Sequence, residues 1–277
     1  MRNLSMPELT GRFGRLGAAI VLATGAVGAV AVSQVFASPA EGKCNPTITR
    51  APFGQTIEPY TGLMTQVYRY TLANCHGMQV NLLSYGAITQ SIAVPDRAGK
   101  VANVVLGFKT LEDYVTKDSP PVTANGGPYL GETIGRFGNR IAKGTFQLRQ
   151  PSGLMTYTLP INNGANDLHG GLIGFGNHVW SQTGDLISTN NEVGVTLMLV
   201  SPNGDGGGAP GSPGCPSGCT GFPAQITVFV TFTLNNQDQY AIHYKAVNNS
   251  SDLNTVINLT NHSYFNLAGE DSPAGSA

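Results

Sequence analysis

Charged residues are scarce in this 277-residue chain, where Asp, Glu, Lys and Arg make up only 11% of the residues. The 15 basic residues nearly balance the 16 acidic ones, so the chain has no excess of positive charge to meet a phosphate backbone. Its four cysteines lack the neighbouring cysteines and histidines that a zinc site requires. The composition therefore predicts neither a nucleic-acid partner nor a bound metal.

Helical periodicity is also lacking after the N-terminal segment, and the chain has no P-loop, dinucleotide-binding glycine motif or nucleophile elbow. It has instead 36 glycines and 17 prolines, which suit a protein with many turns. In residues 224–234 apolar and polar side chains alternate, as is typical of a half-buried antiparallel strand. The apolar face of that strand consists of Ile226, Val228, Val230, Phe232 and Leu234.

Similar alternation predicts further strands, and a run of glycine, proline and serine at 201–223 predicts a long surface loop. The further strands are expected at 78–86, 87–94, 144–149, 193–200, 240–247 and 255–260. Only LEDYV (111–115) has the pattern of a short helical turn. We expect one all-β domain from about residue 45 onward, built as a large antiparallel sandwich or barrel.

The N-terminus has the layout of a secretory signal peptide over residues 1–37. Arg12 and Arg15 precede an uncharged apolar run, and small residues stand at Val35 and Ala37. This pattern predicts a secreted or periplasmic protein with no membrane contact once the signal is cleaved. The apolar run is long, so a retained membrane anchor is the alternative.

Export would allow the four cysteines to form disulfides. Cys215 and Cys219 stand in CPSGC within the long loop, where a small ring would stiffen it. Cys44 and Cys75 could then pair, tying the start of the mature chain to a strand end. Three connectivities remain open at this stage.

Three polar clusters interrupt the predicted strands. The segment 131–146 holds Arg136, Asn139 and Arg140 among glycines, 162–171 holds His169 before two glycines, and 258–269 holds His262. Glycine lets a ligand approach the backbone closely, and Arg and Asn offer directional donors to hydroxyl-rich ligands. A lone histidine in a strand is more often a structural hydrogen-bonding residue, and we assign that role to His76, His178 and His243.

Together these clusters resemble the aldose 1-epimerases, the galactose mutarotase family. The strings NLTNHSYFNL (258–267), GRFGNRIAKGTF (135–146) and NDLHGG (166–171), with GFGNHVW (174–180), match family motifs in order. The resemblance runs from about residue 52 to 269. It implies a large antiparallel β-sandwich of the mutarotase-like supersandwich type.

The resemblance implies an enzyme that interconverts the α and β anomers of free hexoses such as galactose and glucose, without a cofactor. His262 would be the general acid that protonates the ring oxygen, and His169 would hydrogen-bond sugar oxygens. Asn139 and Arg140 would bind hydroxyls, with Arg136 binding or supporting them. Of the two aromatic residues after His262, Tyr264 and Phe265, one would pack in the core and one would shape the site.

The chain departs from the family pattern at its C-terminal end. The family's glutamate base and an aspartate that contacts the sugar lie in segments beyond the histidine motif. We therefore expect residues 45–277 to be an incomplete domain without its C-terminal strands and without its base. Glu270, in a polar tail, is a poor substitute. The cysteine-bearing loop replaces a shorter acidic turn of the family.

Other functions are compatible with the same motifs. A non-catalytic carbohydrate-binding module would keep the His, Arg and Asn residues and lack the base. An enzyme for phosphorylated hexoses would need more basic residues than the strands offer. A purely structural sandwich would not need the ordered polar motifs. We treat the glycosylation sequons at Asn258 and Asn261 as chance matches, and the sequence indicates no oligomeric state.

Overall fold

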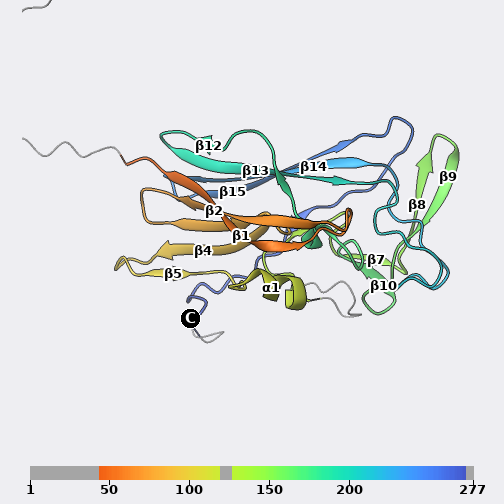
Figure 1. The fold of residues 1–277 in the computed structure, drawn as a ribbon, viewed down its shortest axis with the longest axis horizontal. Coiled ribbons are helices and arrows are strands. Elements are labelled where there is room, and N and C mark those ends of the chain that lie inside the picture. The colour runs from red at the N-terminus through yellow and green to blue at the C-terminus, as the bar shows by residue number, and fades with distance from the viewer. Residues whose placement is uncertain (1–43, 119–126, 273–277) are drawn as a thin grey trace, which may run out of the picture. The chain divides into compact units, whose positions relative to one another are not determined.

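The computed structural model describes residues 44–118 and 127–272, which belong to one compact unit spanning Lys43–Ala277. The predicted signal peptide (1–37) lies outside the described residues. Within the described ranges, no helix has the length and apolar character needed to cross a membrane. The unit is mainly antiparallel β-sheet (Figure 1), which confirms the all-β prediction.

The first large sheet contains five antiparallel strands in sequential order. These are β1 (Thr47–Ile57), β2 (Met64–Ala73), β3 (Gln79–Leu83), β4 (Ile88–Pro95) and β5 (Val101–Asn103). The sequence pattern did not reveal β1, because its alternation is broken at Pro52 and Gly54. The register with β2 shifts between those two residues, as at a β-bulge. Proline is tolerated there because β1 is an edge strand.

The second large sheet has the order β11-β13-β14-β15, with β12 pairing to β13 beside β11. Its strands are β11 (Ser181–Gln182), β12 (Ile187–Ser188), β13 (Glu192–Ser201), β14 (Ile226–Asn235) and β15 (Tyr240–Asn248). Burial alternates strictly along β14, and the five apolar residues predicted for one face are the buried ones. The pairing of β13 with β14 is regular over its whole length.

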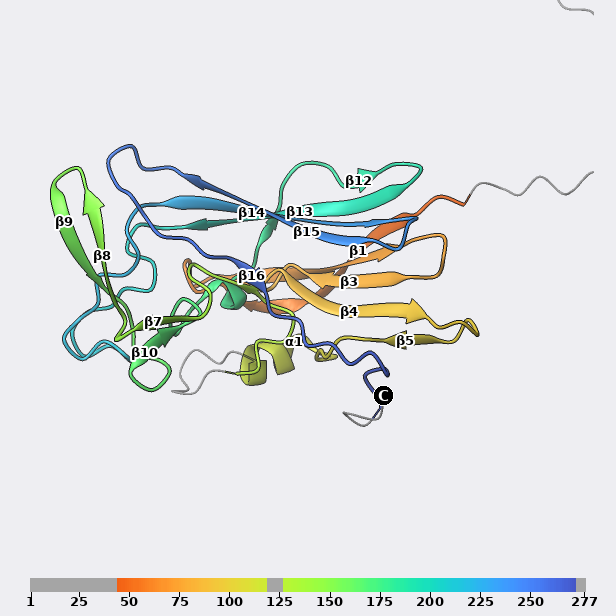
Figure 2. The same ribbon diagram turned by 180° about the vertical axis from the view of Figure 1, so that it is seen from behind.

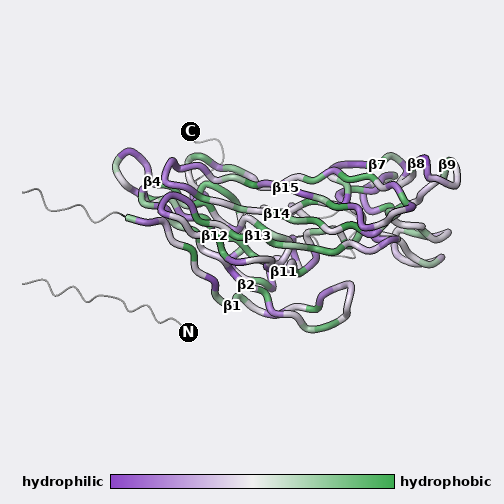
Figure 3. The backbone as a smooth tube through the Cα atoms, turned by 90° about the horizontal axis from the view of Figure 1, so that it is seen from above, coloured by the Kyte–Doolittle hydropathy of each residue, from purple (hydrophilic) through white to green (hydrophobic). Residues whose placement is uncertain are grey.

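The two large sheets face one another and share one hydrophobic core (Figures 1 and 2). Leu72 and Leu82 of the first sheet and Val195 and Val230 of the second are fully buried in this cluster. Figure 3 shows long hydrophobic stretches along β13 and β14. Burying each such side chain contributes about 1.5–3 kcal/mol, so this core is the main source of stability.

Three short strand pairs lie outside the large sheets and carry the polar motifs. They are β6 (Thr133–Ile134) with β16 (Thr260–Asn261), β7 (Arg140–Ala142) with β10 (Asn166–Leu168), and β8 (Thr145–Gln150) with β9 (Gly153–Thr158). Each pair is antiparallel. The first two pairs bring together segments that are far apart in the sequence (Figure 2).

The helical content of the described residues is small. The predicted turn at LEDYV is confirmed as α1 (Leu111–Asp113), continued by the π-helical turn Tyr114–Asp118. The Thr110 hydroxyl accepts a hydrogen bond from the Asp113 N–H at 3.2 Å, which caps the helix start. A short 3-10 helix, Phe175–Asn177, lies between β10 and β11.

The strand predicted at 255–260 is wrong for most of its length. Only Thr260 belongs to a strand there, and Asn258 forms an isolated parallel bridge with Phe137. Alternation shows that a segment can present two faces, but a strand also needs a partner backbone. Here backbone pairing is limited to Asn258, which bonds to Arg136 and Gly138, and its side-chain amide also donates to the Gly138 carbonyl at 3.0 Å.

Of the three connectivities open from the sequence, the structure has Cys44–Cys75 and Cys215–Cys219. The first disulfide ties the segment before β1 to the turn after β2. The second closes a small ring within residues 201–223, which we call the cysteine loop. Cys215 is 1% exposed, so this loop folds inward at its disulfide.

Candidate functional site

Pairing of β7 with β10 places Asn139 beside His169. The register pairs Arg140, the first residue of β7, with Leu168, the last residue of β10. Asn139 and His169 are the next residues beyond this paired end. The Asn139 N–H donates to Nδ1 of His169 at 3.0 Å, and the His169 N–H donates to the Asn139 carbonyl at 3.1 Å. The two predicted sugar-binding residues therefore hold each other in place.

This contact determines which nitrogen of His169 can donate to a ligand. Because Nδ1 accepts the Asn139 N–H, the neutral ring carries its proton on Nε2. Burial, followed by the nearby His262 and Arg140, lowers the pKa of His169 to about 4. At neutral pH the ring is therefore uncharged and presents an Nε2–H donor.

Arg140 is exposed and is oriented by two side-chain amides. Its Nε donates to Oδ1 of Asn163 at 3.0 Å, and its Nη1 donates to Oδ1 of Asn139 at 3.2 Å. Among the described residues its Nη2 group makes no hydrogen bond. A fixed guanidinium with an unused amino group is well suited to bind a hydroxyl oxygen.

The turn that carries His169 is clamped by Asn162. This asparagine is 3% exposed, and its amide nitrogen donates to the carbonyls of Leu168 and Gly171 at 2.9 and 2.8 Å. Its Oδ1 accepts the Leu168 N–H at 2.7 Å. Three hydrogen bonds from one buried side chain hold this turn where a regular sheet could not.

Pairing of β16 with β6 brings His262 to the same place. The His262 N–H donates to the Glu132 carbonyl at 2.9 Å, and its own carbonyl accepts the Gly131 N–H at 3.1 Å. The centroid of its ring lies 5.2 Å from that of His169, at an interplanar angle of 83°. Neither ring nitrogen of His262 bonds to a described residue, so both can contact a ligand.

Tyr129 lies between the two histidines of the candidate site, and no sequence pattern predicted it. Its ring lies 4.8 Å from that of His169 and 5.7 Å from that of His262, so it contacts both. Its hydroxyl has no hydrogen-bond partner among the described residues. Burial raises the pKa of Tyr129 to about 12, so the hydroxyl stays protonated and can donate. An aromatic residue after a proline carries no periodic signal that could have identified it.

Three residues of this cluster have left-handed backbone conformations. The φ angles of Tyr129, Asn139 and His169 are 56°, 67° and 59°. This region is unfavourable for a side chain such as tyrosine, and it persists only where the surroundings impose it. Asn and His adopt this region more readily than Tyr, so Tyr129 is the residue of the three whose conformation indicates local strain.

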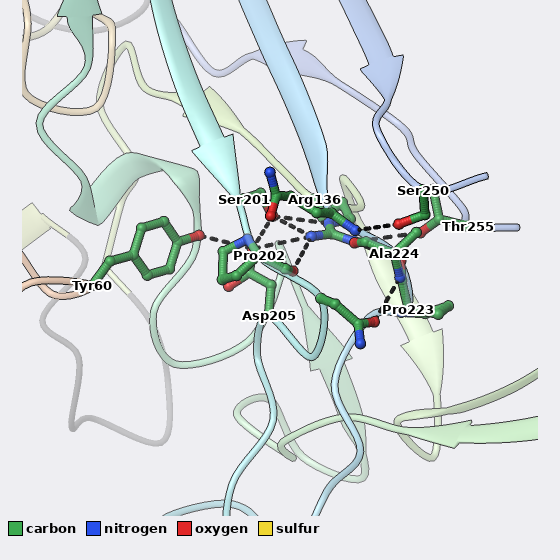
Figure 4. Close-up of polar contacts among 11 residues, drawn as sticks. Tyr60, Arg136, Ser201, Pro202, Asp205, Pro223, Ala224, Ser250 and Thr255 are labelled. Carbon is green, nitrogen blue, oxygen red and sulfur yellow. Dashed lines mark hydrogen bonds and ion pairs between the residues drawn. The ribbon is translucent and has the colours of Figure 1, made fainter. Parts of the chain in front are cut away.

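Arg136 is buried, and Figure 4 shows its polar contacts. It is 1% exposed, and its guanidinium donates to Ser201 and to the carbonyls of Pro202, Pro223 and Ala224. Its Nη2 lies 3.8 Å from Oδ2 of Asp205. All of its donors therefore serve the protein, so the structure does not support direct sugar binding by Arg136. Its position fits the supporting role.

Neither of the two aromatic residues after His262 packs in the core, so that part of the expectation is wrong. Tyr264 is 42% exposed, and its ring lies 5.1 Å from that of His262, so it borders the site. Phe265 is 62% exposed. The backbone of Phe265 forms an isolated bridge to Val105, which turns its side chain away from the sandwich core.

The remaining predicted residues have other partners. The Asn261 amide donates to the Gly131 carbonyl at 2.9 Å, so Asn261, like Asn258, braces the motif. Oε2 of Glu270 accepts from the Asn103 amide at 2.9 Å, beside β5. Buried His178 places Nδ1 2.6 Å from Oε1 of Glu58, and His243 is exposed on β15.

Two of the carboxyl groups that are buried near these motifs have a strongly raised pKa. Asp167 precedes the His169 turn, and Asp118 ends the π-helical turn; both are 0% exposed. Burial raises the pKa of each to about 7. No three His, Cys, Asp or Glu side chains in the described part of the chain gather closely enough to hold a metal ion.

Comparison with known proteins matches these features to a family. The family model described as aldose 1-epimerase matches residues 68–276. Galactose mutarotase of Mus musculus is 36% identical over 227 residues, which cover 82% of this chain and 54% of that protein. Aldose 1-epimerase of Escherichia coli (strain K12) is 32% identical over 228 residues, covering 82% and 53%.

Solved structures agree with the sequence matches. The galactose 1-epimerase of Lactobacillus acidophilus superposes with a TM-score of 0.59 and 25% identity, covering 80% of this chain and 53% of that one. An aldose epimerase homologue from C. elegans gives a TM-score of 0.56 and 29% identity, covering 72% and 51%. The chain thus spans about half the length of the relatives that it matches. With a mutarotase-like fold and the family model matched over most of its length, the chain belongs to the aldose 1-epimerase family.

Proposed function

We propose that this chain binds a free hexose at Asn139, Arg140, His169 and His262 and takes part in interconverting its α and β anomers. The observation that carries the proposal is the pair of histidine rings 5.2 Å apart, one of them held as an Nε2–H donor by the Asn139 N–H. The named activities of the relatives, galactose mutarotase and aldose 1-epimerase, support it. Galactose and glucose are the substrates to test first.

The chemistry follows from what anomerisation needs. The ring opens when the ring oxygen gains a proton and the C1 hydroxyl loses one, and it recloses after rotation about C1–C2. His262 has two unengaged ring nitrogens and would give the proton to the ring oxygen. His169 and Arg140 would donate hydrogen bonds to sugar oxygens and fix the ring beside His262. These proton transfers require no metal or cofactor.

The proton from the C1 hydroxyl needs a base, and we assign that role to none of the described residues. Asp118, Glu132 and Asp167 are at most 1% exposed, so a bound sugar could not reach their carboxyl groups. Glu270 bonds to Asn103 beside β5. In this proposal the acid and the sugar-binding residues are on this chain, and the group that accepts the second proton is not among the described residues.

Polarimetry on freshly dissolved α-D-galactose, with NMR titration of the sugar in parallel, tests the proposal. If the chain accelerates mutarotation, His262→Ala should lower the rate by about 10²–10⁴-fold, the usual contribution of a general acid. Arg140→Met should weaken sugar binding. Sugar binding that neither substitution changes would contradict the proposed site.

A carbohydrate-binding module without catalysis is the second candidate. The specific observation in its favour is that none of the carboxylates just named is available to act as base opposite His262. In that case galactose would bind with the same dependence on Arg140, and the rate of mutarotation would equal that of buffer. The two measurements above separate the two functions.

We also propose that the protein is exported. The signal-like pattern at 1–37 supports this, as do two disulfides, which persist in oxidising compartments. The partner is then a small sugar met outside the cytosol. Mass spectrometry of the N-terminus of protein from the culture medium would show cleavage after Ala37, whereas an intact terminus in the membrane fraction would indicate an anchor.

A further inference from the structure

A second pocket lies beside the proposed sugar site, behind the segment that carries His169. Its volume is about 380 Å³, within the range of small-ligand sites. Its walls come from the turn between β1 and β2, from the residues after His169 and from the cysteine loop. They include Tyr60, Leu172, Ile173, Asp205, Ser212 and Cys215.

Tyr60 forms a rigid aromatic wall of this pocket. One face of its ring stacks on the buried His178, with the ring centroids 3.7 Å apart. Its hydroxyl donates to Oδ2 of Asp205 at 2.9 Å (Figure 4). The side chain is nevertheless 37% exposed. The ring is therefore fixed on one side and at its tip, and it remains accessible to a ligand.

Asp205 provides a carboxylate at the same pocket. It is 8% exposed, and Oδ2 accepts the hydroxyls of Tyr60 and Ser201. The guanidinium of Arg136 lies 3.8 Å from that oxygen and balances the charge. No described residue donates to Oδ1, and the Ser212 hydroxyl makes no hydrogen bond within the described part of the chain. The pocket thus offers an acceptor and a hydroxyl that a ligand can use.

The charges of the residues around the pocket determine which kind of ligand it can bind. The lining residues include no lysine, arginine or histidine, so a phosphate or carboxylate group would meet Asp205 without compensation. A cation would gain little binding energy from Asp205, because Arg136 already balances the charge of that carboxylate. A neutral ligand with hydroxyl donors and an apolar face matches best, since the hydroxyls meet the carboxylate and the face packs on Tyr60.

We propose that this pocket is a second carbohydrate site that binds a neutral pyranose. The apolar C–H face of the sugar packs against Tyr60 and Ile173, and its hydroxyls donate to Oδ1 of Asp205. The disulfide-closed cysteine loop forms the opposite wall. This assignment goes beyond the proposed anomerisation, because it concerns residues outside the histidine cluster and holds whether or not the chain is catalytic.

The pocket and the histidine cluster share one segment of backbone. Leu172 and Ile173 follow His169 by three and four residues. The carbonyl oxygen of Gly170 lies 3.4 Å from where a Cβ on Gly206 would stand, so the His169 turn packs against the cysteine loop. A sugar in the second pocket would therefore rest on the turn that positions His169.

Titration of the whole chain with methyl β-D-galactopyranoside, followed through backbone amide NMR signals, tests the proposal. This glycoside cannot anomerise, so the measurement is independent of catalysis. We expect shifts at the glycines of 204–208 that follow a saturable curve. Ile173→Trp fills the pocket and should weaken this binding by tenfold or more, whereas the Arg140 signals should still respond.

Two matched variants complete the test. Leu154→Trp adds the same bulk at an exposed residue of β9, 59% accessible, and should leave both sites intact. Arg140→Met should abolish the response of the histidine cluster and keep that of the glycines. Three results would overturn the second site. The glycine signals do not shift, they still shift in Ile173→Trp, or galactose 6-phosphate shifts them more strongly than the glycoside does. Failure of the proposed function would instead appear as an unchanged response of the histidine cluster to the sugar in Arg140→Met.

Discussion

The sandwich and the site-bearing end of this protein are stabilised by different interactions. Between the large sheets, regular strands bury Leu, Val and Phe side chains, and stability is spread over many similar contacts. At the site, short strand pairs and turns are held by a few specific bonds, such as those of Asn162 and Arg136. A core of this kind tolerates conservative changes, whereas single residues at the site end have defined and separable roles.

The largest effect is expected from two arginines of one motif. Arg136→Met leaves Asp205 buried beside unpaired carbonyls and should lower the free energy of unfolding by about 3–5 kcal/mol. Arg140→Met, four residues later, removes an exposed guanidinium and should change stability by at most about 0.5 kcal/mol while weakening sugar binding. Urea unfolding and sugar titration of both variants measure the difference. Equal loss of stability in the two variants would contradict a structural role for Arg136 that Arg140 does not share.

The two disulfides should also differ in how much they stabilise the protein. Replacing Cys44 and Cys75 by serine frees a loop with a sequence separation of 31 and should cost about 3–4 kcal/mol by the chain-entropy relation. Replacing Cys215 and Cys219, separated by 4, should cost about 2 kcal/mol. Thermal unfolding of each double variant reports the order. The second variant should also weaken glycoside binding at the second pocket, which the first should not.

The buried carboxyl groups should make a contribution to stability that falls as pH rises, opposite in sign to that of His169, whose pKa burial lowers to about 4. The pKa of Asp167 is about 7 in the folded protein, against about 3.8 for an exposed aspartate, so the folded state binds more protons between these values. Its contribution is fully present below about pH 4 and is lost as pH rises through 7, at up to about 1.4 kcal/mol per pH unit. Asp167→Asn should flatten the curve of unfolding free energy against pH. In that variant part of the pH dependence should remain, because burial also raises the pKa of Asp118.

The smallest effect is expected at Tyr129. Tyr129→Phe keeps the ring between His169 and His262 and removes only a hydroxyl without a described partner. Stability should change by less than about 0.5 kcal/mol, and galactose binding should weaken by roughly 0.5–1.5 kcal/mol if the hydroxyl contacts the sugar. Calorimetric titration with galactose measures this change in affinity, and Tyr157→Phe on β9 serves as the control. Unchanged affinity would leave Tyr129 with a packing role only.

Much of the sandwich could be predicted from the sequence, because alternation of apolar residues has a direct physical cause. The buried face of β14 and the turn at 111–115 were confirmed. Strand β1 was not predicted, since Pro52 and Gly54 interrupt its pattern, and the strand at 255–260 was wrong, since periodicity cannot show whether a partner strand exists. Pairing is a property of the whole fold.

The motifs identified His169, His262, Asn139 and Arg140 as chemistry-bearing residues, because such side chains amid glycines suit a hydroxyl-rich ligand. The resemblance already made Arg136 the weaker candidate for sugar binding, but the sequence could not show that it is buried, since burial is decided by the segments that pack around each guanidinium. It also could not show Tyr129 between the two histidines, because three distant segments meet there.

The sequence by itself therefore determined the all-β class and which residue types are candidates for the site, since both depend on local pattern. Only the tertiary structure decided the tautomer of His169, the interior position of Arg136, the disulfide pairing and the pocket beside the cysteine loop. These features depend on contacts between residues far apart in the chain, such as Asn139 with His169 and Tyr60 with Asp205. Their energies arise only when the backbone brings those residues together.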